Sequence, residues 1–282
     1  MKKGLVLEGG ALRGVFTAGV LDAFLDYGIE FDGVIGESAG AIQGVSYISK
    51  QKGRAFKTTY DWCWSPKYMS WRSLFFTGNY FNVNFCYKKI PEMYPIDEEA
   101  FKNNPAEFYI ACTNCKTAEP FYYNCKEISV DSISMKYLIA SASMPIVARA
   151  IKIDGQKYVD GGIADSVPIK KFQNMGFEKN VVILTQKEKL EEEFNFFTLL
   201  SKIFTPFRRK LIKALETQER RYLEVQDYMK KEEEAGRVFI IRPQEDLAAG
   251  VMERDPEKIK ITYEQGYNEA LRIMDDLKKF LS

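Results

Sequence analysis

A serine in the middle of a glycine-framed pentapeptide is the first group in this sequence with clear chemical potential. Residues 36–40 read Gly-Glu-Ser-Ala-Gly and follow a short apolar stretch at residues 31–35. This is the sequence form of a nucleophile elbow, a tight strand-to-helix turn that exposes a serine hydroxyl. The usual elbow serine is activated by a histidine, but the chain contains no histidine. Ser38 therefore either uses a different base or belongs to a chance match.

Two other glycine-bearing segments could serve such a serine. Residues 9–14 read Gly-Gly-Ala-Leu-Arg-Gly and precede a helical pattern, so their backbone amides could hold a phosphate or an oxyanion at a helix N-terminus. A dinucleotide-binding fingerprint requires glycine where Ala11 stands, which makes nucleotide binding the weakest interpretation. Residues 160–162 read Asp-Gly-Gly, and this triplet alone is more typical of an ordinary turn.

Taken together and in this order, the three segments resemble the signature of the patatin-like phospholipase family. That signature is a glycine loop ending in Arg-Gly, a Gly-x-Ser-x-Gly elbow and an Asp-Gly-Gly turn. Residues 113–123 (TNCKTAEPFYY) and 141–145 (SASMP) resemble two further segments of the family. The resemblance covers roughly residues 4–186 and departs from the family at Ala11, which replaces the third glycine of the loop. Because the family uses a Ser-Asp dyad, the resemblance also accounts for the missing histidine.

The resemblance implies a role for each matching residue. Ser38 is the expected nucleophile and Asp160 its base, which partial desolvation would improve by raising an aspartate pKa that is ordinarily about 3.9. Backbone amides are expected to form the oxyanion hole, namely those of Gly9, Gly10, Ala11 and Ala39. Arg13 either anchors the glycine loop or contacts an anionic head group, and we favour anchoring. The remaining motif residues are expected to support the turns: Gly14, Gly36, Gly40, Gly161 and Gly162.

Short apolar segments alternate with helical patterns along the first two thirds of the chain. Strands are predicted at residues 4–7, 31–35, 107–113, 120–125, 151–153, 157–159 and 181–184, and helices at 15–27, 39–50 and 130–141. This alternation favours an α/β layered sheet. The family resemblance implies a three-layer α/β/α sandwich around a mostly parallel sheet.

The composition changes after residue 186, where a charged stretch begins. We expect a catalytic domain at residues 1–186 and a mainly helical C-terminal region at 187–282 that packs on the core. Within that region the periodicity predicts helices at 207–231 and 255–281 and one strand at 237–242. No chemical motif is recognisable in this region.

Two aromatic segments each allow two interpretations. All three tryptophans lie between Trp62 and Trp71, in an aromatic stretch that ends at Phe81. This stretch either lines an acyl-chain pocket or forms a lid that touches lipid, in which case Trp71→Ala should shift the chain-length preference, or it packs in the core. Residues 194–210 either form an interfacial membrane helix or pack against the catalytic domain, which we favour.

Composition restricts the partners and cofactors. The formal net charge is only +1, so the chain as a whole has no electrostatic field that would attract nucleic acid. The five cysteines are irregularly spaced, and Cys112 and Cys115 are better explained as buried or turn residues than as a redox pair or zinc site. We therefore expect no metal or other cofactor. No apolar run is long enough to span a bilayer, so we expect a cytoplasmic protein, with peripheral membrane contact as an option. No pattern specifies an oligomeric state.

The leading interpretation is a lipid acyl hydrolase of the phospholipase or lysophospholipase type, acting through an acyl-Ser38 intermediate. One alternative is a small-ester or thioester hydrolase with the same dyad. Another is a catalytically inert lipid-binding protein, against which the intact Ser38, Asp160 and glycine loop argue.

Overall fold

A single mixed sheet organises the molecule. The computed structural model describes residues 1–191 and 209–282, and within them eight strands follow the order β5-β6-β3-β2-β1-β7-β8, with β4 paired to β3. The strands are β1 (Lys2–Leu7), β2 (Gly33–Glu37), β3 (Glu107–Asn114), β4 (Pro120–Asn124), β5 (Ile151–Ile153), β6 (Gln156–Asp160), β7 (Phe177–Ile183) and β8 (Val238–Ile241). Strands β3, β2, β1, β7 and β8 pair in parallel, whereas β4, β5 and β6 pair antiparallel. The predicted α/β class with a mostly parallel sheet is confirmed.

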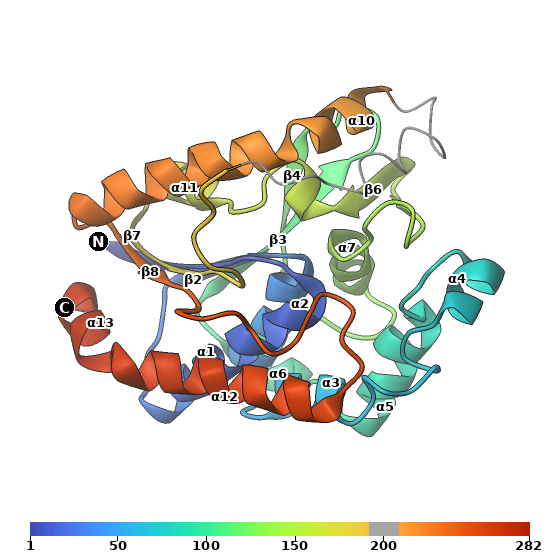
Figure 1. Cartoon of the computed structure of the whole chain (residues 1–282), viewed down its shortest axis with the longest axis horizontal. Coiled ribbons are helices and arrows are strands. Elements are labelled where there is room, and N and C mark those ends of the chain that lie inside the picture. Colours follow the sequence, from blue (N-terminus) through green and yellow to red (C-terminus); the bar gives the residue numbers. More distant parts are fainter. Residues whose placement is uncertain (192–208) are drawn as a thin grey trace.

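Helices cover both faces of this sheet (Figure 1). They are α1 (Val15–Asp26), α2 (Ser38–Ile48), α3 (Arg54–Tyr60), α4 (Trp71–Thr77), α5 (Ile90–Met93), α6 (Glu98–Asn103), α7 (Ile133–Ser141), α8 (Ile169–Asn174), α10 (Arg209–Glu216), α11 (Gln218–Glu234), α12 (Pro256–Arg272) and α13 (Met274–Leu281). The described residues also contain short helical turns, which are η1 (Ala11–Gly14), η2 (Phe85–Lys89) and η3 (Gly161–Ile163).

The alternation of side chains along β1 shows how the two layers are built. Successive residues of a strand point to opposite faces. Leu5 and Leu7 join the core cluster that contains Phe16 of α1, while Val6 joins the cluster that contains Phe172 of α8 and Tyr222 of α11. Because every one of these side chains is buried, β1 is covered on both faces, as a central parallel strand must be.

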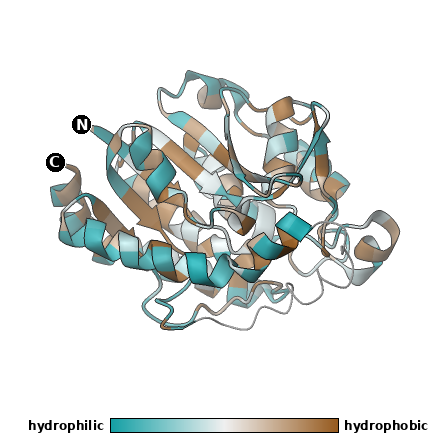
Figure 2. Ribbon diagram, turned by 90° about the horizontal axis from the view of Figure 1, so that it is seen from above, coloured by the Kyte–Doolittle hydropathy of each residue, from teal (hydrophilic) through white to brown (hydrophobic). Residues whose placement is uncertain are grey.

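The C-terminal region extends the same sheet and packs on both layers. Strand β8 pairs in parallel with β7, and α12 crosses α1 so closely that a Cβ on Gly266 would lie 2.0 Å from the carbonyl oxygen of Phe16. On the other face, Figure 2 shows α11 turning mostly hydrophilic residues outward above hydrophobic strands. The C-terminal region therefore contributes to the core of the molecule, and a domain division at residue 186 stays a prediction.

Two long helices predicted from periodicity are each broken in the structure. The first is divided into α10 and α11 at Thr217, where the Arg221 guanidinium donates a 2.8 Å hydrogen bond to the carbonyl oxygen of Ala214. The second is divided into α12 and α13 at Ile273. The spacing of apolar residues does not reveal such breaks, because buried residues are present in the helix before each break and in the helix after it. Of the aromatic segment at 194–210, residues 194–208 lie outside the described residues.

Candidate active site

The strand-turn-helix context of Ser38 is that of a nucleophile elbow. Ser38 is the first residue of α2 and follows β2 directly. Its φ of 49° lies in the left-handed region, which costs a residue with a side chain roughly 1–2 kcal/mol. The turn also needs glycine, because a Cβ on Gly40 would lie 2.4 Å from the carbonyl oxygen of Leu7. Backbone strain of this kind gathers at functional sites.

Ser141 holds the elbow in this conformation. The Ser38 amide donates a 2.8 Å hydrogen bond to Ser141 Oγ, and that hydroxyl donates in turn to the carbonyl oxygen of Ala111 at 2.6 Å. Ser141 is fully buried at the end of α7. Ser141 is the first residue of the Ser-Ala-Ser-Met-Pro segment, and nothing in the sequence of that segment indicated that its hydroxyl would support the elbow.

The glycine loop lies beside the elbow because β1 and β2 are parallel neighbours. The Gly9 amide donates a 2.6 Å hydrogen bond to Glu37 Oε1, so this amide already has an acceptor within the protein. Ala11 has a φ of 50°, a conformation natural to the glycine that the family signature has there. Ala11 begins the turn η1 and Ala39 lies in the first turn of α2, where backbone N–H groups have no acceptor within the helix.

Asp160 ends β6 in a buried, hydrogen-bonded position. Its side chain accepts a 2.9 Å hydrogen bond from the Gly162 amide, and its own amide donates to the carbonyl oxygen of Ser143 at 3.0 Å. Burial raises the pKa of Asp160 to about 6, although the nearby side chains of Ser38 and Glu37 and the hydrogen bond from the Gly162 amide act in the opposite direction. A carboxylate with a pKa near 6 is a stronger base than an ordinary aspartate.

Glu37, at the first of the two variable positions of the pentapeptide, connects the glycine loop to Asp160. It is 4% exposed, and burial, followed by the negative charge of Asp160, raises its pKa well above the usual range. A Cβ on Gly162 would lie 3.1 Å from Glu37 Oε2 and 3.2 Å from Asp160 Oδ1, so the two carboxyl groups flank the same glycine. Sequence reasoning missed this residue, although it adjoins Ser38.

A cavity of about 650 Å³ contains most of the predicted site residues. They are Ser38, Asp160, Gly9, Gly10, Ala11, Ala39, Arg13 and Gly162. The positive charge of Arg13 counteracts the rise in pKa that burial imposes on Glu8. Four other motif glycines are absent from the cavity lining within the described residues: Gly14, Gly36, Gly40 and Gly161. These four pack against neighbouring backbone and side chains instead.

The rest of the cavity wall is largely apolar, with Ile42, Val45, Leu138 and Ile139 from α2 and α7 among its lining residues. The aromatic stretch at 62–81 is divided between three environments. Tyr68 and Phe81 line the cavity, Met69 and Tyr80 are buried, and Trp71 is 67% exposed. Trp71 therefore does not line this cavity, because α4 directs its side chain to solvent.

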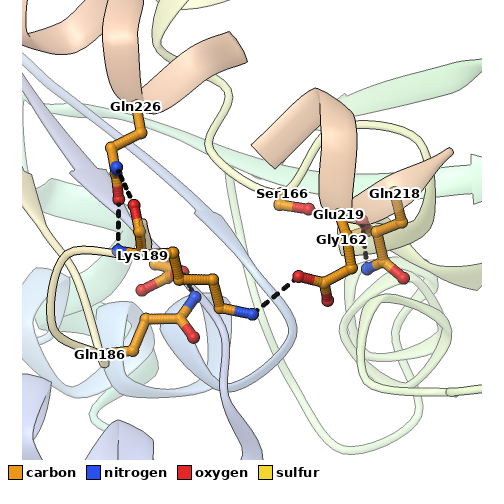
Figure 3. Close-up of polar contacts among 8 residues, drawn as sticks. Gly162, Ser166, Gln186, Lys189, Gln218, Glu219 and Gln226 are labelled. Carbon is orange, nitrogen blue, oxygen red and sulfur yellow. Dashed lines mark hydrogen bonds and ion pairs between the residues drawn. The ribbon is translucent and has the colours of Figure 1, made fainter. Parts of the chain in front are cut away.

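The C-terminal region supplies a polar wall to the same cavity (Figure 3). Lys189 forms a 2.7 Å ion pair with Glu219 on α11, and its backbone amide and carbonyl are hydrogen-bonded to the Gln226 side chain at 3.0 and 2.8 Å. Gln218 donates a 2.8 Å hydrogen bond to the carbonyl oxygen of Gly162, two residues beyond Asp160. A region without a recognisable motif thus reaches the centre of the site.

Comparison with known proteins identifies the family. The sequence matches the profile of the patatin-like phospholipase family over residues 5–172. The chain belongs to the patatin-like phospholipase family. In this patatin-like protein, residues 208–282 also match a family described as a domain of unknown function, DUF6363.

The patatin-like chain is similar to several named proteins. It is 26% identical over 250 residues to the uncharacterized protein YjjU of Escherichia coli, covering 86% of this chain and 69% of that protein. It is 25% identical over 182 residues to the lysophospholipase nte1 of Aspergillus terreus, covering 61% of this chain but only 11% of that much longer protein. The crystal structure of VipD from Legionella pneumophila matches with a TM-score of 0.49 and 13% identity, over 98% of this chain and 67% of that one.

The described residues contain neither a metal-binding cluster nor a helix that could span a membrane. Within 1–191 and 209–282, no group of three or more acidic or cysteine side chains is arranged to hold a metal ion. In the same ranges, no helix has both the length and the apolar character needed to cross a membrane.

Proposed function

We propose that this protein is a serine hydrolase that cleaves lipid acyl esters through a Ser38–Asp160 dyad. One observation carries the proposal: Ser38, with its strained backbone, and Asp160, a buried aspartate, both line the same cavity. Burial also raises the pKa of Asp160 to about 6. Membership of the patatin-like phospholipase family and the likeness to a lysophospholipase support lipid hydrolysis.

The first half of the proposed reaction transfers the acyl group to the protein. Ser38 Oγ attacks the ester carbonyl carbon while Asp160 accepts the hydroxyl proton. Amides near the elbow stabilise the oxyanion, and we assign this task to Gly10, Ala11 and Ala39, since the Gly9 amide is bound to Glu37. Collapse of the tetrahedral intermediate breaks the ester bond, and the leaving alcohol takes the proton from Asp160.

The second half releases the fatty acid. A water molecule attacks the acyl-Ser38 ester as Asp160 accepts a proton from it. The second tetrahedral intermediate then collapses, and the proton returns to Ser38 Oγ as the carboxylic acid departs. Both halves need Asp160 ionised before attack, which its pKa of about 6 permits at neutral pH.

The two kinds of cavity wall suggest how a lipid would lie. The apolar residues of α2 and α7 suit an acyl chain, and the polar side chains of Gln186, Lys189 and Gln218 suit the hydrophilic part of the substrate. Peripheral contact with a lipid surface would then bring the ester to Ser38.

Mass spectrometry of lipid extracts incubated with the protein tests this function. We expect fatty acid to accumulate with the wild-type chain, and Ser38→Ala to reduce its release at least about 10³-fold. A panel running from short-chain esters and thioesters to lysophospholipids and diacyl phospholipids identifies the substrate class. Hydrolysis confined to short esters would contradict the lipid assignment, and equal turnover by Ser38→Ala would contradict the serine mechanism.

A further inference from the structure

Helix α4 carries three large aromatic side chains that are mostly exposed in the part of the chain that the structure describes. The exposed fractions are 67% for Trp71, 83% for Phe75 and 69% for Phe76. We call these three residues the aromatic tip. In Figure 1, α4 projects from the edge of the molecule, and Figure 2 shows the same projection from a perpendicular direction. Clustered exposed aromatic residues mark interaction surfaces in soluble proteins.

The aromatic tip is mounted on the wall of the cavity. The Ser70 amide, just before α4, donates a 3.0 Å hydrogen bond to the carbonyl oxygen of Tyr80, and the Asn82 amide donates to that of Tyr68 at 2.9 Å. The base of this loop therefore includes Tyr68 and Phe81, which line the cavity. One loop thus has a base in the cavity wall and an aromatic tip in solvent.

The loop that carries the aromatic tip contains only basic charges. Residues 62–91 contain no aspartate or glutamate, and Lys67, Arg72 and Arg149 are exposed. The guanidinium of Arg72 lies 5.8 Å from the ring centre of Phe76, and the Arg149 amide donates a 2.9 Å hydrogen bond to Asn79 beside α4. Exposed aromatic residues with basic neighbours suit the boundary of an anionic bilayer.

We propose that the aromatic tip inserts into the surface of an anionic lipid bilayer and brings the adjoining cavity wall to the acyl layer. The choice of a bilayer as the occupant rests on the proposed function, on the continuity between tip and cavity, and on the basic charge of this loop. Aromatic rings supply the apolar insertion, and the three basic residues attract the anionic head groups.

Co-sedimentation of the full chain with phosphatidylcholine vesicles containing phosphatidylglycerol tests the proposal. We expect the wild type to bind these vesicles, and to bind pure phosphatidylcholine vesicles more weakly. The triple variant Trp71→Ser/Phe75→Ser/Phe76→Ser should bind at least about tenfold more weakly, since burial of even one large apolar side chain changes a partition by about that factor. The matched control, Ile261→Ser/Leu271→Ser, removes exposed apolar residues of α12 and should bind like the wild type.

Hydrolysis of a soluble short-chain ester separates this proposal from the proposed function. The triple variant should retain wild-type turnover of that ester, which also verifies its fold. Vesicle binding that the triple variant retains in full would overturn the docking proposal while leaving the hydrolase intact. Vesicle binding lost in the variant, in a protein that hydrolyses no ester, would support docking and contradict the hydrolase. A wild-type dimer that the triple variant dissociates would show that a second copy occupies the aromatic tip, and would overturn the bilayer assignment.

Discussion

The backbone amide of Ser38 donates a 2.8 Å hydrogen bond to the buried hydroxyl of Ser141. The two residues are 103 positions apart in the sequence, and the bond joins the nucleophile elbow to the end of α7. Because Ser141 Oγ also donates to the carbonyl oxygen of Ala111 on β3, one hydroxyl connects the elbow, a helix and the central sheet. The strained φ of Ser38 is thereby held by a side chain outside the pentapeptide.

We therefore expect Ser141→Ala to destabilise the protein by about 1–3 kcal/mol, because it leaves the amide of Ser38 without this acceptor. Urea denaturation measures the loss of stability. Ser143→Ala is the matched control, since its hydroxyl donates to the carbonyl oxygen of Ile139 within the same segment. Equal stability of Ser141→Ala and the wild type would show that the elbow does not depend on this bond.

A second prediction concerns Glu37, which accepts the Gly9 amide and flanks Gly162 together with Asp160. Burial and the charge of Asp160 favour its protonated form. A glutamine has the same shape, can accept from Gly9 and can donate toward Asp160. We expect Glu37→Gln to keep most of the ester hydrolysis, and Glu37→Ala to lower kcat/KM by about 10–10² through displacement of the glycine loop.

Kinetics with a soluble ester, combined with circular dichroism to verify folding, distinguish the two Glu37 variants. An inactive but folded Glu37→Gln would show that an ionised Glu37 is needed. A fully active Glu37→Ala would show that the contact with Gly9 has no part in catalysis.

The raised pKa of Asp160 predicts the pH dependence of the reaction. The ionised carboxylate is the base, so kcat/KM should rise about tenfold per pH unit below the pKa and level off above about 6. A pH–rate profile with an uncharged soluble ester measures this limb. An acid limb near the ordinary aspartate value would contradict a desolvated base.

The same pKa predicts a stability cost at neutral pH. The folded state holds the Asp160 proton more tightly than the unfolded chain, so the contribution of this group to stability is present below its ordinary value of 3.8 and is lost as the pH rises through about 6. At neutral pH, Asp160→Asn should therefore be more stable than the wild type by about 1–3 kcal/mol, and the difference should shrink toward about pH 4.

Thermal melts across this pH range test the stability prediction, with Asp131→Asn as the control at an exposed carboxylate. A destabilised Asp160→Asn at neutral pH would mean that hydrogen bonds to the carboxylate outweigh its desolvation.

The sequence predicted the fold class and the family because both are encoded locally. Apolar runs mark the buried parallel strands, and the three motifs each lie at the end of a strand, after β1, β2 and β6. Their roles in catalysis stay predictions, but the structure brings Ser38, Asp160 and the glycine loop to one cavity.

Other features depend on contacts between distant segments, which no local pattern contains. The partner of Glu37 is Gly9, 28 residues earlier, and Gln218 reaches Gly162 from 56 residues later. Trp71 is a large aromatic residue of the kind that lines apolar pockets, but its position on α4 exposes its side chain to solvent. Aromatic content alone does not distinguish a pocket, a core and a surface patch, because all three favour the same side chains.

Covalent labelling with an alkyl fluorophosphonate, followed by peptide mass spectrometry, tests the central claim most directly. The account predicts a single adduct on Ser38, formed at a rate that rises with pH to a plateau above about 6 and at least about 10³-fold more slowly in folded Asp160→Asn. Labelling of Ser38 at the wild-type rate in Asp160→Asn, or an adduct on a different residue, would contradict it.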